Sequence, residues 1–188
     1  MGRIVLVTGG SRSGKSAYAQ KLGETLRPPR TFIATCPVLD DEMRERIRKH
    51  QQARAAHDWQ TVEETANLAE AVRGAKASHV VLVDCLSLWV NNLMYEAQLA
   101  GNSVTEDEIS RRCQEVLAAC AAVSGTVIVV TNEVGMGIIP ENALARRFRD
   151  LAGRCNQVMA AKADAVTLMV AGLPVELKKE RAARRGSR

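Results

Sequence analysis

The chain has 188 residues, 46% hydrophobic and 25% charged, which predicts one globular domain, expected over residues 1–177. No apolar run approaches the ~20 residues of a membrane span, and the five cysteines form no C-x-x-C pair, so we expect a cytoplasmic protein without a zinc site or disulfide framework. The net charge of +5 lies in the last eleven residues, six basic and one acidic, which predicts a disordered basic tail over 178–188 and no nucleic-acid partner.

The first predicted strand, Ile4–Val7, runs directly into Gly9-Gly10-Ser11-Arg12-Ser13-Gly14-Lys15-Ser16. This segment has the G-x-x-x-x-G-K-S pattern of a phosphate-binding loop, in which backbone N–H groups surround an anion and the following helix adds its positive dipole end. Lys15 would reach the β- and γ-phosphates, and the Ser16 hydroxyl would ligate Mg²⁺. Because an amphipathic helix, Lys15–Leu26, follows the segment, we favour this interpretation over a glycine turn with an incidental lysine.

Short apolar runs alternate with longer helical patterns along the rest of the chain. Further strands are predicted at Thr31–Ala34, His79–Asp84, Thr126–Thr131, Ala165–Val170 and Val175–Leu177. Further helices are predicted at Asp41–Ala56, Glu63–Gly74, Leu86–Ala100, Thr105–Val123 and Glu141–Ala163. The runs Val80–Val83 and Val127–Val130 are apolar throughout, as in strands covered on both faces. The alternation predicts a doubly wound α/β domain whose ligands bind at the carboxyl ends of parallel strands.

An aspartate, Asp84, ends the apolar strand that begins at His79. A buried strand that delivers a carboxylate beside a phosphate loop is the usual second half of a nucleotide site, where the carboxylate holds Mg²⁺ directly or through water. Many strands end in Asp as a helix cap, but next to this loop we favour the metal. We therefore expect Ser16 and Asp84 to hold Mg²⁺.

A long loop, Asn132–Pro140, follows the strand at Thr126–Thr131 and contains two glycines and a proline. Glu133 lies at its start, near the expected position of the phosphates. The loop is either a long turn with a capping glutamate or a substrate loop that brings an acid close to the transferred phosphoryl group. The sequence does not decide between these two interpretations.

His50 lies on the predicted helix Asp41–Ala56, on the face that carries its apolar residues, with Arg46 and Arg54 one turn away on either side. A lone histidine is usually structural, and His57 is interpreted in that way. Neighbouring cations, however, keep an imidazole neutral and nucleophilic, and they attract phosphate. His50 is therefore either a structural residue or a nucleophile near the triphosphate.

Residues over nearly the whole chain, except the tail, match one family pattern: Thr8 to Ser16, Ile33 to Thr35, Asp40 to Met43, Arg46, Ile47, His50, Trp59, Thr61, Glu63, Thr131 to Asn142, Arg147 to Asp150, Gly153, Asn156 and Gln157. Together they resemble the bifunctional adenosylcobinamide kinase/adenosylcobinamide-phosphate guanylyltransferases of cobalamin biosynthesis. Many kinases share the phosphate loop. The Asn132–Gly137 block and the placement of Arg46, Ile47 and His50 are far more specific.

The resemblance implies a P-loop NTPase fold of the RecA-like type, with a mostly parallel sheet flanked by helices and a short antiparallel C-terminal strand. It implies two reactions at one nucleotide site. First, ATP or GTP phosphorylates the aminopropanol hydroxyl of adenosylcobinamide. GTP then gives its guanylyl group to an enzyme histidine, which by position is His50, and the cobinamide phosphate takes the GMP to give adenosyl-GDP-cobinamide.

The resemblance also implies the cofactor Mg²⁺, the substrates GTP and ATP, and a homotrimer. The family's nucleotide contacts map onto residues at several strand ends and after the histidine: Gly9, Gly10, Ser11, Arg12, Ser13, Gly14, Lys15, Ser16, Ala34, Thr35, Cys36, Gln51, Gln52, Ala53, Arg54, Glu63 and Asp84.

Two other functions compete with the two-step enzyme. One is a single-function small-molecule kinase in which His50 is structural. The other is a RecA-like ATPase that acts on a polymer, which is disfavoured because the fold body is neutral and no basic stripe accompanies Trp59 or Trp89 for base stacking. Both tryptophans are interpreted as packing residues.

Overall fold

The computed structural model of the protein describes residues 2–37 and 57–179. The expected helix Asp41–Ala56, and with it His50, lies outside the described residues. Residues 180–188 of the expected basic tail lie outside them too.

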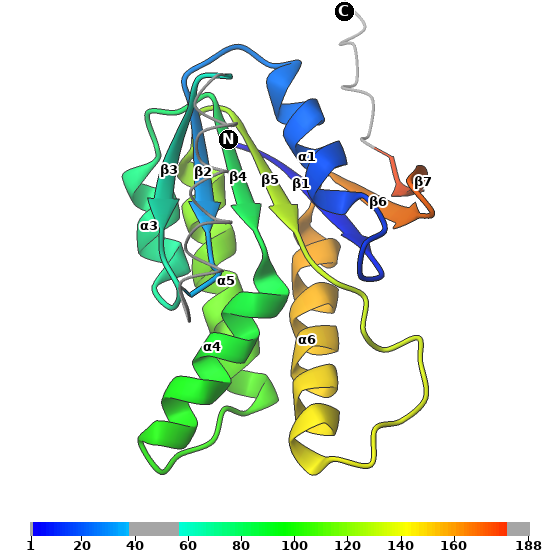
Figure 1. The fold of residues 1–188 in the computed structure, drawn as a ribbon. Coiled ribbons are helices and arrows are strands. Elements are labelled where there is room, and N and C mark those ends of the chain that lie inside the picture. Colours follow the sequence, from blue (N-terminus) through cyan, green and yellow to red (C-terminus); the bar gives the residue numbers. More distant parts are fainter. Residues whose placement is uncertain (1, 38–56, 180–188) are drawn as a thin grey trace, which may run out of the picture.

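In the described part of the chain, seven strands form one sheet in the order β3-β2-β4-β5-β1-β6-β7 (Figure 1). Every neighbouring pair is parallel except β6 and β7, which are antiparallel. The strands are β1 (Arg3–Gly9), β2 (Arg30–Ala34), β3 (Trp59–Glu63), β4 (Val80–Asp84), β5 (Thr126–Val130), β6 (Ala165–Val170) and β7 (Leu173–Lys178). The prediction of a mostly parallel sheet with a short antiparallel C-terminal strand is confirmed.

The helices of the described residues are α1 (Lys15–Glu24), α3 (Leu68–Gly74), α4 (Leu86–Leu99), α5 (Glu106–Ala122) and α6 (Ala143–Lys162). Each lies where the sequence predicts a helix. The predicted cap of α5 is present, because the Thr105 hydroxyl accepts a hydrogen bond of 3.2 Å from the backbone N–H of Glu108.

The predicted start of α3 is wrong. The helix expected from Glu63 begins only at Leu68, because the chain before it forms the edge strand β3 in register with β2, from Arg30 opposite Trp59 to Ala34 opposite Glu63. Five residues in which neither face is fully apolar are a weak strand signal, and pairing with β2 decides the conformation.

Helices cover both faces of the sheet, and the strand side chains alternate between two hydrophobic clusters. On one face α1 packs against β1, β4 and β5, with Val5, Val7 and Trp59 in its cluster. On the other face, with α3 to α6, lie Leu6 and Trp89 (Figure 1). Both tryptophans are buried, as expected of packing residues. Strands β4 and β5 carry apolar side chains to both faces, which explains their unbroken apolar sequences.

The last strand, β7, extends one residue into the segment that was expected to be the tail. Lys178 ends β7, and its ammonium donates to the carbonyls of Ala160 (3.3 Å), Ala161 (3.2 Å) and Ala163 at the C-terminal end of α6. A cation at this end of a helix satisfies carbonyls that have no partner within the helix.

Arg30 joins the end of α1 to the edge of the sheet. Its guanidinium donates to the carbonyls of Gly23 (3.2 Å), Glu24 (3.1 Å) and Leu26 (2.5 Å), and to that of His57 before β3 (3.1 Å). The side chain is only 10% exposed. The helix that follows the phosphate loop is therefore anchored at its far end.

We expect Arg30→Met to lower the free energy of unfolding by about 2–3 kcal/mol, because buried carbonyls lose a charged donor. Urea denaturation followed by circular dichroism measures this loss. Arg73→Met is the matched control: Arg73 is 49% exposed and pairs with Glu70 on the surface, so its loss should cost no more than about 0.5 kcal/mol. Equal losses in the two variants would contradict the anchoring role of Arg30.

Candidate nucleotide-binding site

The phosphate loop leaves β1 with backbone angles that only glycine adopts easily. Gly9 has φ of 148° and Gly14 has φ of 93°, and a Cβ on Gly9 would lie 2.4 Å from the carbonyl oxygen of Met169. The turn between β6 and β7 supports the loop from the side, since the N–H of Gly172 donates to the Ser13 carbonyl at 3.1 Å. The loop then enters α1 at Lys15, so the N-terminal end of α1 faces the expected phosphate position.

The Lys15 side chain folds back onto this loop. Its ammonium donates to the Gly10 carbonyl at 2.6 Å, and the residue is 7% exposed. Burial lowers the pKa of Lys15, and nearby Cys85 and Asp84 partly oppose this effect. Because burial disfavours the charged ammonium, a bound phosphate would stabilise it by supplying a negative partner. The ammonium needs only to turn from Gly10 toward that phosphate.

Four of the predicted site residues that the structure describes lie along one edge of the sheet, because they end parallel strands. Gly9 ends β1, Asp84 ends β4, Ala34 ends β2 and Glu63 ends β3. With about 4.8 Å between neighbouring strands, β4 lies ~10 Å from β1 and β3 lies ~19 Å away. The structure thus places Asp84 at the same edge as Lys15, and its charge raises the pKa of Lys15 against the larger effect of burial. It places Glu63 too far from β1 for a phosphate contact, at a distance that suits the nucleoside end.

The residue after β2, Thr35, uses its side chain to join two strand ends. Its hydroxyl donates to the Cys85 carbonyl and accepts from the Cys85 N–H, both at 2.7 Å, and it is fully buried. Asn92 donates to the Thr35 carbonyl at 2.8 Å. Any nucleotide contact made by this segment therefore falls to its backbone or to Ala34 and Cys36.

The oxygen donors at this edge fit Mg²⁺. Among the described residues, no three His, Cys, Asp or Glu side chains gather into a metal cluster. Mg²⁺ needs no such cluster, because it keeps several waters and is usually held by one or two protein oxygens together with substrate phosphates. Ser16 in the first turn of α1 and Asp84 at the end of β4 offer that set.

The loop that begins at Asn132 is tied to the start of the phosphate loop. The Glu133 N–H donates to the Gly9 carbonyl at 2.9 Å, while its carboxylate accepts from the Gly135 N–H at 3.1 Å. Asn156 of α6 holds the base of this loop, with a 2.7 Å hydrogen bond to the Thr131 hydroxyl and one of 3.0 Å to the Asn132 carbonyl. The carboxylate thus caps its own turn, as one interpretation of Glu133 expects, while its backbone N–H joins the residue to the phosphate loop. A role of the acid in phosphoryl transfer stays a prediction.

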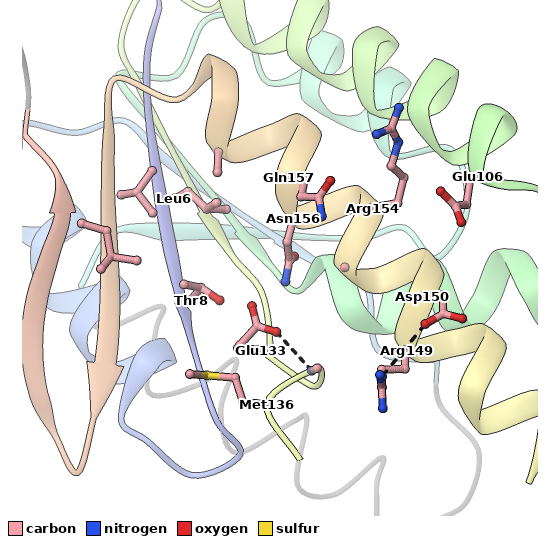
Figure 2. A pocket seen from close by; sticks show the side chains of 15 residues that line it. Leu6, Thr8, Glu106, Glu133, Met136, Arg149, Asp150, Arg154, Asn156 and Gln157 are labelled. Atoms are coloured by element: carbon pink, nitrogen blue, oxygen red, sulfur yellow. Dashed lines mark hydrogen bonds and ion pairs between the residues drawn. The ribbon is translucent and has the colours of Figure 1, made fainter. Parts of the chain in front are cut away.

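A pocket of about 650 Å³ lies between this loop, α6 and the face of β1 that α6 covers (Figure 2). Sequence analysis gave no role to Arg149 or to Asn156 on its wall. The signal that could have found them is their position in α6, where polar residues recur on the helix face that lies toward the strand ends.

The remaining predicted site residues cannot be placed. His50, Gln51, Gln52, Ala53 and Arg54 all lie outside the described residues, so their roles stay predictions.

A buried strand that runs into a folded G-x-x-x-x-G-K-S loop, with an acidic strand end two strands away, defines a P-loop NTPase. Solved structures agree with this fold. The flagellar accessory protein FlaH of Methanocaldococcus jannaschii superposes with a TM-score of 0.54 over 95% of this chain and 79% of that chain, at 14% identity. A KaiC-like protein of Pyrococcus horikoshii gives 0.51 over 88% and 70%, at 17% identity. At these identities the likeness shows the fold alone.

The family model described as cobinamide kinase / cobinamide phosphate guanyltransferase matches residues 5–177. The bifunctional adenosylcobalamin biosynthesis protein CobU of Escherichia coli is 43% identical over 93% of this chain and 99% of its own length. Its Salmonella typhimurium counterpart is also 43% identical, with the same coverage, and CobP of Pseudomonas aeruginosa is 38% identical over 93% of this chain and 97% of its own. The chain belongs to the cobinamide kinase / cobinamide phosphate guanyltransferase family, as its motifs predict.

We expect the affinity for ATP to fall with rising pH, beginning below the ordinary lysine pKa of 10.5, because burial lowers the pKa of Lys15 and only its protonated form attracts phosphate. Calorimetric titration with ATP between pH 7 and pH 10 measures this, and the adenine base does not titrate there. Lys15→Arg is the control: it stays charged, so its affinity should not change over this range. A flat wild-type profile would contradict the role of Lys15.

Proposed function

We propose that the protein carries out both family reactions at the edge of the sheet that holds the phosphate loop. It phosphorylates the aminopropanol hydroxyl of adenosylcobinamide with ATP or GTP, and then transfers GMP from GTP to the new phosphate through a histidine intermediate. Family membership supports the two activities. The observation that carries the proposal is the folded phosphate loop with Lys15 inside it and Asp84 nearby.

In the kinase step, the hydroxyl oxygen of the acceptor loses its proton to solvent and forms a bond to the γ-phosphorus. The bond from that phosphorus to its bridging oxygen breaks, and the nucleoside diphosphate leaves. The loop N–H groups and the α1 dipole hold the phosphates in place, and Lys15 turns from Gly10 to offset the charge on the leaving nucleoside diphosphate. Bound Mg²⁺, held by Ser16 and Asp84, would supply further charge neutralisation at the phosphate oxygens.

In the guanylyl-transfer step, we assign the nucleophile to His50. Its imidazole nitrogen bonds to the α-phosphorus of GTP and pyrophosphate leaves, and an oxygen of the cobinamide phosphate then displaces the imidazole. Two displacements replace one difficult reaction between a phosphate monoester and a triphosphate. The cations Arg46 and Arg54 would attract the nucleotide. Both residues lie outside the described range, and the assignment rests on the sequence.

The strand order suggests how GTP lies along the edge. With its phosphates at β1, the nucleoside would extend across β4 toward β2 and β3, past Asp84 and the segment Ala34 to Cys36, with Glu63 at the far end. The span from β1 to β3 of about 19 Å is comparable with an extended nucleoside triphosphate. We therefore assign Glu63 to the guanosine. The assignment of Gln51 to Arg54 to the same nucleotide rests on the family resemblance alone, because they lie outside the described residues.

We expect wild-type protein incubated with GTP labelled at the α-phosphate to keep the label after denaturation, with the alkali-stable, acid-labile behaviour of a phosphoramidate. His50→Ala should lose the label and retain γ-phosphoryl transfer to cobinamide, because only the second reaction needs the imidazole. His57→Ala is the matched control and should label like the wild type. A labelled His50→Ala protein would show that another residue carries GMP, and an unlabelled wild type would indicate a single-function kinase in which His50 is structural.

We also propose that the protein is a homotrimer that works in the cytoplasm. The five cysteines are free thiols, as expected of a reducing compartment. No helix of the described residues is long and apolar enough to cross a membrane. Two apolar surfaces support self-association: the loop residues Met136, Ile138 and Ile139, and Leu173 and Leu177 on β7, all more than half exposed.

We expect light scattering coupled to gel filtration to give a mass of about three times the 20.4 kDa chain. Ile138→Asp and Leu173→Asp should each shift the protein toward the monomer, because a charge would enter an apolar contact. Leu99→Asp is the control, since Leu99 is 71% exposed at the end of α4, away from both surfaces. A monomeric wild type would refute the trimer.

A further inference from the structure

The pocket between β1, α6 and the loop after β5 reaches two residues that adjoin the phosphate loop. Thr8, the residue before Gly9, and Glu133 line it (Figure 2). The Glu133 N–H donates to the Gly9 carbonyl at 2.9 Å. From these residues the pocket extends along Arg149, Gly153 and Gln157 of α6 toward Leu177 of β7. A molecule in this pocket would therefore have one end beside the expected phosphates.

Two residues of the pocket wall hold buried polar atoms that are left without a hydrogen bond. Within the described residues, the Thr8 hydroxyl and the Nη1 atom of Arg149 have no partner, and Thr8 is only 7% exposed. The Arg149 side chain is 24% exposed, and its Nε lies 4.0 Å from an Asp150 carboxylate oxygen. An unpaired buried hydroxyl or guanidinium nitrogen is costly, so both atoms favour a ligand that brings oxygen acceptors.

A third feature of the wall is a glycine in the middle of a helix. Gly153 lies within α6, where glycine is unfavourable compared with alanine. A Cβ built there would have no atom within 4 Å. The glycine is therefore not needed to avoid a clash inside the protein. Its missing side chain leaves open space on the pocket side of α6.

The pocket does not suit the nucleotide itself. It carries three carboxylates, Glu106, Glu133 and Asp150, against two guanidinium groups, Arg149 and Arg154, and the latter already donates to Ser110 at 2.8 Å. This balance opposes a triphosphate. The pocket also lies on the α6 face of β1, whereas α1 covers the other face.

We propose that this pocket binds the acceptor substrate, with the aminopropanol arm of the cobinamide pointing to Thr8 and Glu133 and the amide groups of the corrin near Arg149 and Gln157. The inference rests on the proposed function, which requires an acceptor beside the phosphate loop. It accounts for the unpaired Thr8 and Arg149 atoms and for Gly153. The alcohol, and later its phosphate, then meets the nucleotide from the side opposite α1.

The test fills the pocket with a side chain. Gly153→Leu should raise the KM for cobinamide at least about tenfold while the KM for ATP stays within about twofold, because only the acceptor loses its space. Labelling of the protein by GTP without cobinamide should not change. Leucine is a better helix former than glycine, so the variant should fold and melt at a higher temperature.

Gly74→Leu is the matched control. Gly74 is also helical, ending α3, and its Cβ would also meet nothing within 4 Å, but it lies beside a different groove. Its KM values should equal those of the wild type. Arg149→Met keeps most of the side-chain volume and removes the donors, so it should raise the KM for cobinamide by about tenfold. Arg149→Lys should restore part of that loss.

Several results would overturn the proposal. One is an unchanged KM for cobinamide in Gly153→Leu. Another is a weakened affinity of this variant for ATP and not for cobinamide, which would make the pocket part of the nucleotide site. A third is loss of the oligomer with normal KM values, which would make the pocket a subunit contact.

Equilibrium dialysis with cobinamide alone, followed by its visible absorbance, separates this inference from the proposed function. If the wild type binds cobinamide and Gly153→Leu does not, the assignment of the pocket to cobinamide is supported even if the protein transfers no phosphoryl group. If the wild type transfers phosphate and Gly153→Leu binds cobinamide normally, the proposed function stands and the pocket assignment fails.

Discussion

The burial of β1 between β5 and β6 fixes the position of the phosphate loop, and the rest of the site is arranged around that fixed point. The side chains of β1 belong to both hydrophobic clusters, so the strand cannot shift without disturbing both layers. At its end, Gly9 has no space for a Cβ because the Met169 carbonyl lies against it. The loop is therefore held by a packed core on one side and by β6 on the other, and its N–H groups are positioned before any nucleotide binds.

Polar contacts between strand ends hold the rest of the edge in register. Thr35 bonds twice to Cys85 between β2 and β4, Ser87 accepts from the Asn132 N–H at 2.7 Å, and Asn156 bonds to Thr131. Each unmade bond of this kind would cost about 1–3 kcal/mol at a buried position. These contacts lie directly beneath the proposed nucleotide and acceptor positions, so the stability of the fold and the geometry of the site depend on the same residues.

Much of the site could be predicted from the sequence because its parts lie at the ends of strongly apolar strands. The phosphate loop after β1 and Asp84 after β4 are local patterns, and the parallel arrangement that brings them together follows from the unbroken apolar runs of β4 and β5. The edge strand β3 was missed because its five residues carry little signal of their own. Thr35 was expected to contact the nucleotide, and its hydroxyl bonds to Cys85, a contact across fifty residues that no local pattern reveals.

The sequence by itself determined the class of fold, the phosphate loop and the family, because these depend on residue types at fixed short spacings. Only the tertiary structure decided that Lys15 is buried against Gly10, that Glu63 lies at the far end of the edge, and that Thr8, Arg149 and Gly153 share one pocket. The physical reason is that burial and distance across the sheet arise from strand order and from the packing of distant elements, such as β1 against α6. Those elements are separated by more than a hundred residues, and their contact exists only in the folded chain.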